Sequence, residues 1–511
     1  MVGEIKKTEI SEFFYKNAHL LGFTYPGKNM IIAVHELVTN SLDNCIENKI
    51  EPIIKIEIKQ MEQDKKDYFK LIVSDNGTGI PEKNLETIFS KFLQGSKFGV
   101  NKESSGQQGI GASGVILFSK ATTGKPTKMT TINNGKKYVV EIDMDIKSGK
   151  SLNKIISMEK ANKNEHGTTL EVYLKNVAYS VGQASVDEYI KLLFLANPFA
   201  TITLKNPNGE KTEYKALTKM PEPPKELKYH PLGLSAHDLV SLFDESNSKN
   251  LSEFLSHHLQ KMSPRKENEL SKMLNIDFSK IKKGQLDFQT SEKIINRFKD
   301  LKLPRPSSEN LLPIGEKELE SSLKQLYTPE FYSIIERPPK VYKGGIAFKV
   351  ECAVGWQGSC GKKNSTTGFF EPVNVRFANR VPLLFNWSAD IVYNVMKEIR
   401  IQSYIKIEGN NLPLTIITNI NSSNIPYSDV SKMSIADIEE IHNELHLAIL
   451  EALRKISIYV NKKHREMKEK EYKDKMKTYI EIVAESMSDI SDNYKKKDWI
   501  KDKLENIIES R

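Results

Sequence analysis

Two polar side chains four residues apart, Glu36 and Asn40, could supply a general base and a metal ligand side by side. Residues at i and i+4 share one face of a helix, so a helix here would present both to one ligand. A carboxylate can take a proton from a nearby water, and an amide oxygen is a ligand that Mg²⁺ accepts. A polar face of an amphipathic helix is the alternative for an isolated pair of this kind.

A second carboxylate, Asp75, opens a glycine-rich turn with the sequence Asp-Asn-Gly-Thr-Gly-Ile. A carboxylate at the end of a strand can accept a hydrogen bond from the exocyclic amine of adenine. Gly77 and Gly79 would let the backbone turn sharply behind it. The alternative is a plain Asp-Asn-Gly turn without a ligand.

A third motif, residues 106–113, has the sequence Gly-Gln-Gln-Gly-Ile-Gly-Ala-Ser. Backbone N–H groups of such a segment can surround phosphate oxygens, and the N-terminus of a following helix adds partial positive charge. No Gly-Lys-Ser/Thr sequence closes the motif, so it is not a Walker loop. A flexible linker is the alternative, although the apolar run Val115–Phe118 follows at once.

These motifs need a helix and two strands to position them. Apolar residues recur at helical spacing between Ile31 and Leu42, which predicts a helix carrying the first motif. Residues Tyr68–Ser74 form a strand candidate that ends at Asp75, and Thr168–Leu174 alternate as a half-buried strand would.

In this order, the three motifs resemble the N, G1 and G2 boxes of the GHKL ATPases, a family that includes gyrase, Hsp90, histidine kinases and MutL. The resemblance implies an α/β sandwich that holds ATP between helices and a mixed sheet. It implies that Glu36 is the general base, that Asn40 is the Mg²⁺ ligand and that Asp75 contacts adenine. A Gly-Thr element implies a further nucleotide contact at Thr169. The remaining nucleotide contacts that the resemblance implies are Gly79, Ser96, Lys97, Gly106, Gln107, Gln108, Gly109, Ile110, Gly111, Ala112 and Ser113.

The flanking sequences are similar to one branch, the B subunits of DNA topoisomerase VI. The segments that carry this resemblance are residues 10–17, 35–43, 104–113, 425–432 and 435–441. The resemblance extends to about residue 460 and implies an ATP-hydrolysing subunit of a type IIB topoisomerase. ATP-driven self-dimerisation would gate the passage of double-stranded DNA, and a separate A subunit would cut DNA within an A₂B₂ tetramer. The implied location is cytoplasmic, with the nucleoid.

Proline-rich breaks at Pro221–Pro224 and Leu303–Pro306 divide the chain into an expected α+β multidomain protein. We expect a GHKL ATPase domain with an N-terminal strap at 1–225 and an all-helical helix–two-turn–helix domain at 226–305. A βαβ-type transducer should occupy 306–460, with strands at Ile346–Val354 and Leu414–Thr418 and a long helix from near Ser434. A basic helical extension should follow at 461–511.

The resemblance also implies a transducer lysine that contacts the γ-phosphate, since an ammonium group makes charge-assisted hydrogen bonds to phosphate. Relatives carry Ser-Thr-Lys before the Ile-Pro motif, whereas this chain has Ser422-Ser423-Asn424. Asparagine cannot supply the charge. We therefore assign this catalytic and nucleotide-binding role to Lys432, against the alternative of a solvated surface lysine.

Composition excludes several classes. The chain has 511 residues, 39% hydrophobic and 28% charged, and no apolar run of the roughly 18 residues that a membrane span needs. Three cysteines give no disulfide framework and no zinc-ligand spacing. The net charge of +9 permits contact with DNA. Asp143-Met144-Asp145 imitates a metal-binding carboxylate pair, but we interpret it as an exposed strand end.

Two other functions share these motifs. An ATP-operated clamp of the MutL or Hsp90 kind would also dimerise with ATP, but DNA-stimulated hydrolysis and supercoil relaxation with an A subunit would separate it from a topoisomerase. A histidine kinase needs a phosphoacceptor helix before the ATPase motifs, and only a short segment precedes Glu36.

Overall fold

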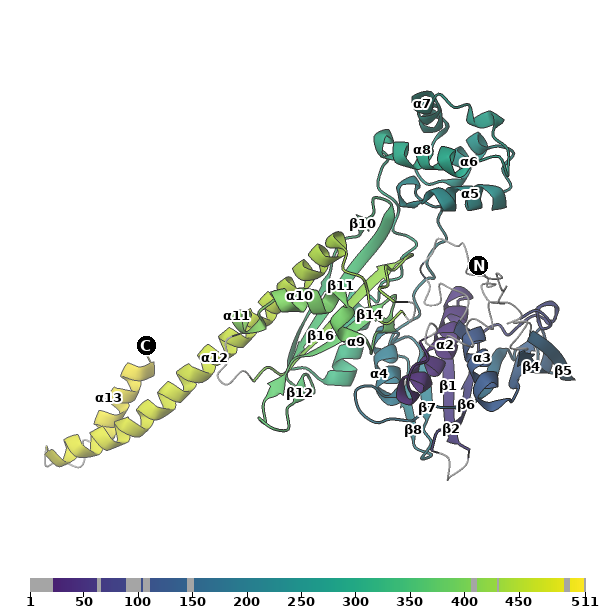
Figure 1. Cartoon of the computed structure of the whole chain (residues 1–511). Coiled ribbons are helices and arrows are strands. Elements are labelled where there is room, and N and C mark those ends of the chain that lie inside the picture. The colour runs from purple at the N-terminus through teal and green to yellow at the C-terminus, as the bar shows by residue number, and fades with distance from the viewer. Residues whose placement is uncertain are drawn as a thin grey trace, which may run out of the picture.

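The computed structural model describes residues 22–61, 66–88, 103, 111–144, 151–405, 411–429, 432–490 and 497–509. Two sheets lie beside each other, a group of small helices sits at one end, and one long helix projects away from both sheets (Figure 1).

The α-helices are α2 (Pro26–Glu47), α3 (Gly111–Thr123), α4 (Val186–Ala196), α5 (Ala236–Glu245), α6 (Leu251–His258), α7 (Pro264–Leu274), α8 (Phe288–Phe298), α9 (Glu316–Tyr327), α10 (Ile391–Glu398), α11 (Ile401–Tyr404), α12 (Glu439–Ile490) and α13 (Lys497–Glu509). The strands are β1 (Ile53–Gln60), β2 (Tyr68–Ser74), β3 (Thr127–Asn133), β4 (Lys136–Met144), β5 (Ser151–Lys160), β6 (Gly167–Lys175), β7 (Thr201–Lys205), β8 (Lys211–Tyr214), β9 (Phe331–Glu336), β10 (Lys340–Tyr342), β11 (Ile346–Trp356), β12 (Lys362–Lys363), β13 (Phe370–Glu371), β14 (Val373–Ala378), β15 (Val381–Pro382) and β16 (Leu414–Ser422).

The first sheet has the strand order β5-β4-β3-β6-β2-β1-β7-β8. Its neighbours are antiparallel except β1 and β7, which run parallel. Helices α2, α3 and α4 pack on it, and the apolar side of α2 is buried in the same hydrophobic core as the strands. The predicted helix and both predicted strands are therefore confirmed, and together they form an α/β sandwich.

The all-helical prediction for the middle of the chain is also confirmed. Helices α5 to α8 each begin at a residue whose side chain accepts a backbone N–H: Ser235, Asn250, Ser263 and Asp287. They enclose a hydrophobic cluster of their own, built around residues such as Phe243, Phe254 and Phe298.

The second sheet has the order β10-β11-β16-β14-β15, with β9 on the other side of β11. β14 and β16 are parallel and are connected through α10, which is the expected βαβ arrangement. Every residue of β16 is buried, and the first half of α12 packs its apolar residues against this sheet. β16 thus lies between β11 and β14, and α12 covers one face of the sheet.

The long helix begins at Glu439, later than the expected start near Ser434. The N–H of Ile435 donates to Asp390 Oδ2 at 2.9 Å, and the N–H of Ala436 donates to the Pro426 carbonyl at 2.7 Å. A helix that starts at Ser434 would need the Ser434 and Ile435 carbonyls for its own hydrogen bonds, but they accept from the N–H groups of Ser428 and Ile391, both at 3.0 Å, so the helix starts later. The helix then runs to Ile490, and α13 folds back along it as a hairpin (Figure 1).

One sequence prediction is wrong in part. Met144 is buried rather than exposed at the end of β4, while Asp143 forms an ion pair with Lys120 at 2.6 Å. Asp145 lies outside the described residues. The three cysteines are free and buried. Within the described ranges, no helix is both long and apolar enough to cross a membrane.

Candidate active site

Helix α2 presents Glu36, Asn40 and Asn44 at intervals of four residues as a half-buried stripe, while most of their neighbours are buried. The Glu36 side chain keeps 26% of its surface exposed. Asn40 Nδ2 donates to the Glu36 carbonyl oxygen at 2.7 Å, which directs the amide oxygen away from the helix backbone. The base and the metal ligand predicted from sequence therefore lie together on one face of α2.

Gly111, the first residue of α3, approaches Glu36 closely. A Cβ atom at Gly111 would lie 1.7 Å from Glu36 Oε2, so only glycine fits there without a shift. The carboxylate thus lies against the N-terminus of α3, where the positive end of the helix dipole favours negative charge. Ala112 is partly buried and Ser113 is buried behind it. The other predicted contacts in this part of the chain lie outside the described residues: Ser96, Lys97, Gly106, Gln107, Gln108, Gly109 and Ile110.

His35, on the buried side of α2, lies close to the Glu36 carboxylate. Its Nδ1 is 2.9 Å from the Tyr189 hydroxyl, and its Nε2 is 3.8 Å from Glu36 Oε1. Burial lowers the pKa of His35; the charge of Glu36 opposes this effect and that of Lys432 adds to it. A neutral imidazole ring therefore flanks Glu36 at neutral pH.

Asp75 follows β2 and is fixed by three donors. Its Oδ1 accepts from the N–H groups of Gly77 at 2.9 Å and Thr168 at 3.2 Å, and its Oδ2 accepts from Ser41 Oγ at 2.9 Å. Burial raises the pKa of Asp75, and these hydrogen bonds oppose that rise. The carboxylate is held in one orientation at the edge of the sheet, and Oδ2 has a lone pair left for a ligand.

Close backbone approaches explain the glycines after Asp75. At Gly79, which has φ +70°, a Cβ would lie 2.0 Å from the Ile132 carbonyl oxygen. At Gly77 a Cβ would lie 2.1 Å from Asn44 Oδ1. The turn therefore packs between α2 and β3, and larger residues would open it.

Thr169 lies on β6 beside β2, and its hydroxyl donates to Ser74 Oγ at 2.9 Å. This position agrees with the predicted strand and places Thr169 next to the strand that leads into Asp75. Asn44 is a further residue of the candidate site that was not predicted from the sequence. Its Oδ1 accepts from the N–H of Thr78 at 3.0 Å. Its spacing of four from Asn40 is a signal that could have identified it.

Lys432 lies in the loop between β16 of the second sheet and α12. Its loop is organised by Asp429, whose carboxylate accepts from the N–H of Met433 at 3.2 Å and from Ser434 Oγ at 2.7 Å. Met433 is buried in the hydrophobic core that contains α2. The charge of Lys432 acts on the pKa of His35, the residue next to Glu36 in the middle of α2. The structure therefore brings together two predicted residues that are far apart in sequence.

The side chains of this site fit the ligands that the resemblance implies, ATP and Mg²⁺. Gly77 and Gly111 let the backbone approach the Asn44 and Glu36 side chains closely, and Asp75 offers an oriented acceptor, as a nucleotide requires. No group of three or more His, Cys, Asp or Glu side chains among the described residues could hold a metal ion. Asn40 offers one amide oxygen, and Mg²⁺ is usually held by one or two protein oxygens together with phosphates and waters.

Two protein families match the chain. Residues 29–177 match the family described as "Histidine kinase-, DNA gyrase B-, and HSP90-like ATPase". Residues 306–472 match "Topoisomerase VI B subunit, transducer". Among solved structures, the B subunit of DNA gyrase from Myxococcus xanthus is 10% identical, with a TM-score of 0.43 over 88% of this chain and 95% of that chain.

Curated relatives match nearly the whole length. The B subunit of type 2 DNA topoisomerase 6 from Thermococcus gammatolerans is 33% identical, over 99% of this chain and 96% of its own. That of Methanothermobacter thermautotrophicus is 35% identical, over 93% of this chain and 90% of its own. The identity and the coverage on both sides leave no large unmatched part, and the chain belongs to the family of type 2 DNA topoisomerase 6 B subunits.

Proposed function

We propose that this chain binds and hydrolyses ATP at the site formed by α2, α3, the Asp75 turn and the Lys432 loop, and that hydrolysis drives DNA strand passage. The observation that carries the proposal is the position of Glu36 against the glycine start of α3, next to His35, whose pKa the charge of Lys432 lowers. A general base, a phosphate-binding helix end and a cation are the parts that phosphoryl transfer to water requires.

Each described residue takes one role. Asp75 accepts a hydrogen bond from the adenine amine, and Thr169 lies on the strand beneath the base. Asn40 supplies an oxygen to Mg²⁺, which would neutralise phosphate charge when bound. Glu36 takes the proton from the attacking water, and the N–H groups at the start of α3 bind phosphate oxygens. The segment from Gly106 to Ile110, with Ser96 and Lys97, would complete the phosphate contacts.

Lys432 is the proposed sensor of the γ-phosphate. Its loop follows β16 and leads into α12. Hydrolysis would remove the contact between Lys432 and the γ-phosphate. The loss of that contact would change the orientation of the second sheet relative to the first. Lys432 would therefore report the nucleotide state to α12.

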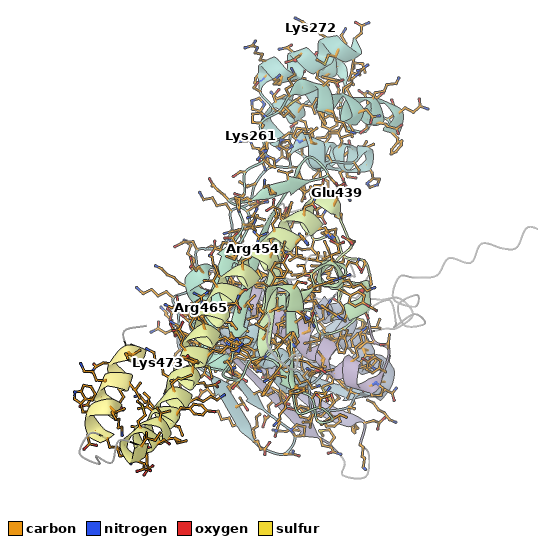
Figure 2. All side chains as sticks on the ribbon, turned by 90° about the vertical axis from the view of Figure 1, so that its left-hand side faces the viewer. Lys261, Lys272, Glu439, Arg454, Arg465 and Lys473 are labelled. Atoms are coloured by element: carbon orange, nitrogen blue, oxygen red, sulfur yellow. The ribbon has the colours of Figure 1, made fainter. Side chains whose placement is uncertain are left out.

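The proposed assembly is an A₂B₂ tetramer acting on double-stranded DNA, with ATP-dependent contact between two copies of this chain. Within it, the chain would divide into ATPase (1–225), helix–two-turn–helix (226–305), transducer (306–460) and extension (461–511). Figure 2 shows Arg454, Arg465 and Lys473 projecting along α12, and Lys261 and Lys272 on the small helical group. These basic side chains are candidates for phosphate contacts with DNA.

The test combines this chain with a purified A subunit of the same family. We expect ATP hydrolysis that DNA stimulates, and relaxation of supercoiled plasmid that needs both subunits and ATP. Sizing with a non-hydrolysable ATP analogue should show a dimer of this chain, and ADP should leave mostly monomer. Hydrolysis without any DNA effect, or relaxation independent of ATP, would instead favour a clamp of the MutL or Hsp90 kind.

A further inference from the structure

A buried carboxylate outside the proposed active site, Glu103, contacts the second sheet. Only 6% of its surface is exposed. Its Oε2 accepts from the N–H of Leu312 at 2.6 Å, and its Oε1 accepts from Asn421 Nδ2 at 2.8 Å. Its own N–H donates to the Asn310 carbonyl at 2.9 Å. Glu103 stands three residues before Gly106 in the sequence, so it anchors the chain just ahead of the glycine-rich motif.

The contact continues through the interior of the second sheet. Asn421 Oδ1 accepts from Asn419 Nδ2 at 2.8 Å, and the same nitrogen lies 2.6 Å from Glu351 Oε2. Asn419 and Asn421 lie on β16, and Glu351 lies on the adjacent β11. Glu351 in turn accepts the N–H groups of Ile314 and Gly315, which precede α9. Buried polar side chains therefore connect Glu103 with the centre of the second sheet.

Arg380 joins the first sheet to the same network. Its Nε and Nη2 donate to the carbonyl oxygen of Ala196 at the end of α4, both at 3.0 Å. Its guanidinium lies 4.8 Å from the centre of the Phe199 ring. Its positive charge acts on both Glu103 and Glu351, and burial lowers its own pKa to about 10. The network thus has anchors in both halves of the molecule.

We propose that Glu103 is a positioning residue that ties the start of the glycine-rich motif to β16, and so couples nucleotide binding to the second sheet. The inference rests on the proposed phosphate-binding role of residues 106–113. It adds a second connection between the two sheets, separate from Lys432, and one that does not touch the nucleotide.

The polarity of this contact is fixed by its surroundings. Leu312 offers a backbone N–H, which can only donate. Asn421 must present its NH₂ group to Glu103, because its oxygen already accepts from Asn419. Both Glu103 oxygens therefore face donors, and a glutamine would place its own NH₂ group against one of them. Burial raises the pKa of Glu103 to about 8, while the donors of Leu312 and Asn421 oppose that rise.

The experiment exchanges the two partners in the full chain, combined with its A subunit. Glu103→Gln and Asn421→Asp are each expected to lower the number of strand passages per ATP hydrolysed by about tenfold, as when one buried hydrogen bond is lost. In the double variant the glutamine can donate to the aspartate, but the Leu312 carbonyl, which accepts from Asn421 Nδ2 at 3.1 Å, stays without that donor. Coupling should therefore recover in part, by about threefold over Asn421→Asp alone. Glu86→Gln, an exposed glutamate before the same motif, should behave as wild type.

Alanine substitutions at the same two positions provide a second test in case the exchanged pair folds poorly. Thermal unfolding is measured for every variant. Glu103→Ala and Asn421→Ala should each uncouple hydrolysis from passage, and the double variant should be no worse than either one. Additive losses, or full coupling in the single variants, would overturn the inference. Glu36→Ala is measured in parallel. If Glu36→Ala hydrolyses ATP normally, the proposed function is wrong. If Glu36→Ala is inactive but the Glu103 variants couple hydrolysis to strand passage fully, only the inference about Glu103 is wrong.

Discussion

Glu36 is the residue on which the proposed hydrolysis depends. Glu36→Ala should lower ATP turnover by about 10²–10⁴-fold, the usual contribution of a positioned base. It should leave binding of a fluorescent ATP analogue intact, since the carboxylate is not a nucleotide ligand in this proposal. Glu86→Ala serves as the control because Glu86 is exposed. Normal turnover in Glu36→Ala would assign the base to another residue.

Asp75 should make nucleotide affinity depend on pH. Its carboxylate must be ionised to accept from the adenine amine, and burial raises its pKa, so affinity should fall on acidification before an ordinary aspartate titrates. Asp75→Asn keeps the shape but should weaken ATP binding roughly 10–100-fold and remove that pH dependence.

The stability of the folded protein should move in the opposite direction. Because the folded-state pKa of Asp75 lies above the unfolded value, its stabilising contribution is complete at low pH and is lost as pH rises through the folded pKa. Asp75→Asn should therefore not lower the free energy of unfolding at neutral pH, since Ser41 Oγ can accept from the new amide. A large loss of stability would mean that the binding defect reflects misfolding.

Lys432 connects the nucleotide to the second sheet in our proposal. Lys432→Ala should keep analogue binding but lose hydrolysis by about 10²-fold or more, the cost of removing one donor to developing charge, and lose strand passage with it. Lys363→Ala, which removes an exposed lysine on β12, is the matched control. If Lys432→Ala relaxes plasmid at the wild-type rate, the sensor lies elsewhere.

At the scale of elements, the turn after β2 is set by close packing rather than by backbone angle alone. Gly79 and Gly124 share a φ of +70°, yet a Cβ at Gly124 would meet nothing within 4 Å, whereas one at Gly79 would lie 2.0 Å from a carbonyl oxygen. Gly124→Ala should cost about 1–2 kcal/mol of unfolding free energy, the penalty for a left-handed residue with a side chain.

Gly79→Ala should cost clearly more than Gly124→Ala and should also weaken ATP binding, because the turn that carries Asp75 must shift. Chemical denaturation and analogue titration of both variants measure the difference. Equal losses of stability in the two variants would show that the contact with Ile132 relaxes without cost.

At the scale of the molecule, α12 leaves the second sheet after about residue 460 and forms a hairpin with α13 (Figure 1). The hairpin is joined by ion pairs such as Lys501–Glu481 at 2.9 Å, and it exposes Tyr479 by 61% and Ile490 by 86%. Ile482, Val483 and Met487 are exposed on the same stretch of α12, and a contiguous exposed apolar patch is typical of a binding surface. We expect this surface to bind the A subunit.

A chain that ends at residue 460 should therefore keep DNA-independent ATP hydrolysis and its unfolding temperature, while losing association with the A subunit and plasmid relaxation. Analytical ultracentrifugation of the mixed subunits measures the association directly. Undiminished association of the shortened chain would place the contact on the two sheets instead.

The sequence by itself determined the local elements, the nucleotide motifs and the family. The helix carrying Glu36, the strand before Asp75 and the glycine-rich turns follow from periodicity and residue type, which act over a few positions. The start of α12 was placed too early, because the Ser434 and Ile435 carbonyls accept from Ser428 and Ile391 rather than from a helical turn, and no local pattern shows these contacts.

Only the tertiary structure decided which distant residues meet. The bond between Glu103 and Asn421 spans 318 positions, and the influence of Lys432 on His35 likewise crosses from one sheet to the other. Such contacts depend on how the two sheets pack, and packing is set by the shapes of whole buried faces rather than by any short stretch of sequence. In the sequence, Glu103 cannot be distinguished from other polar residues. It connects the two halves of the molecule only because the fold buries it, so that its hydrogen bonds are made to protein groups and not to water.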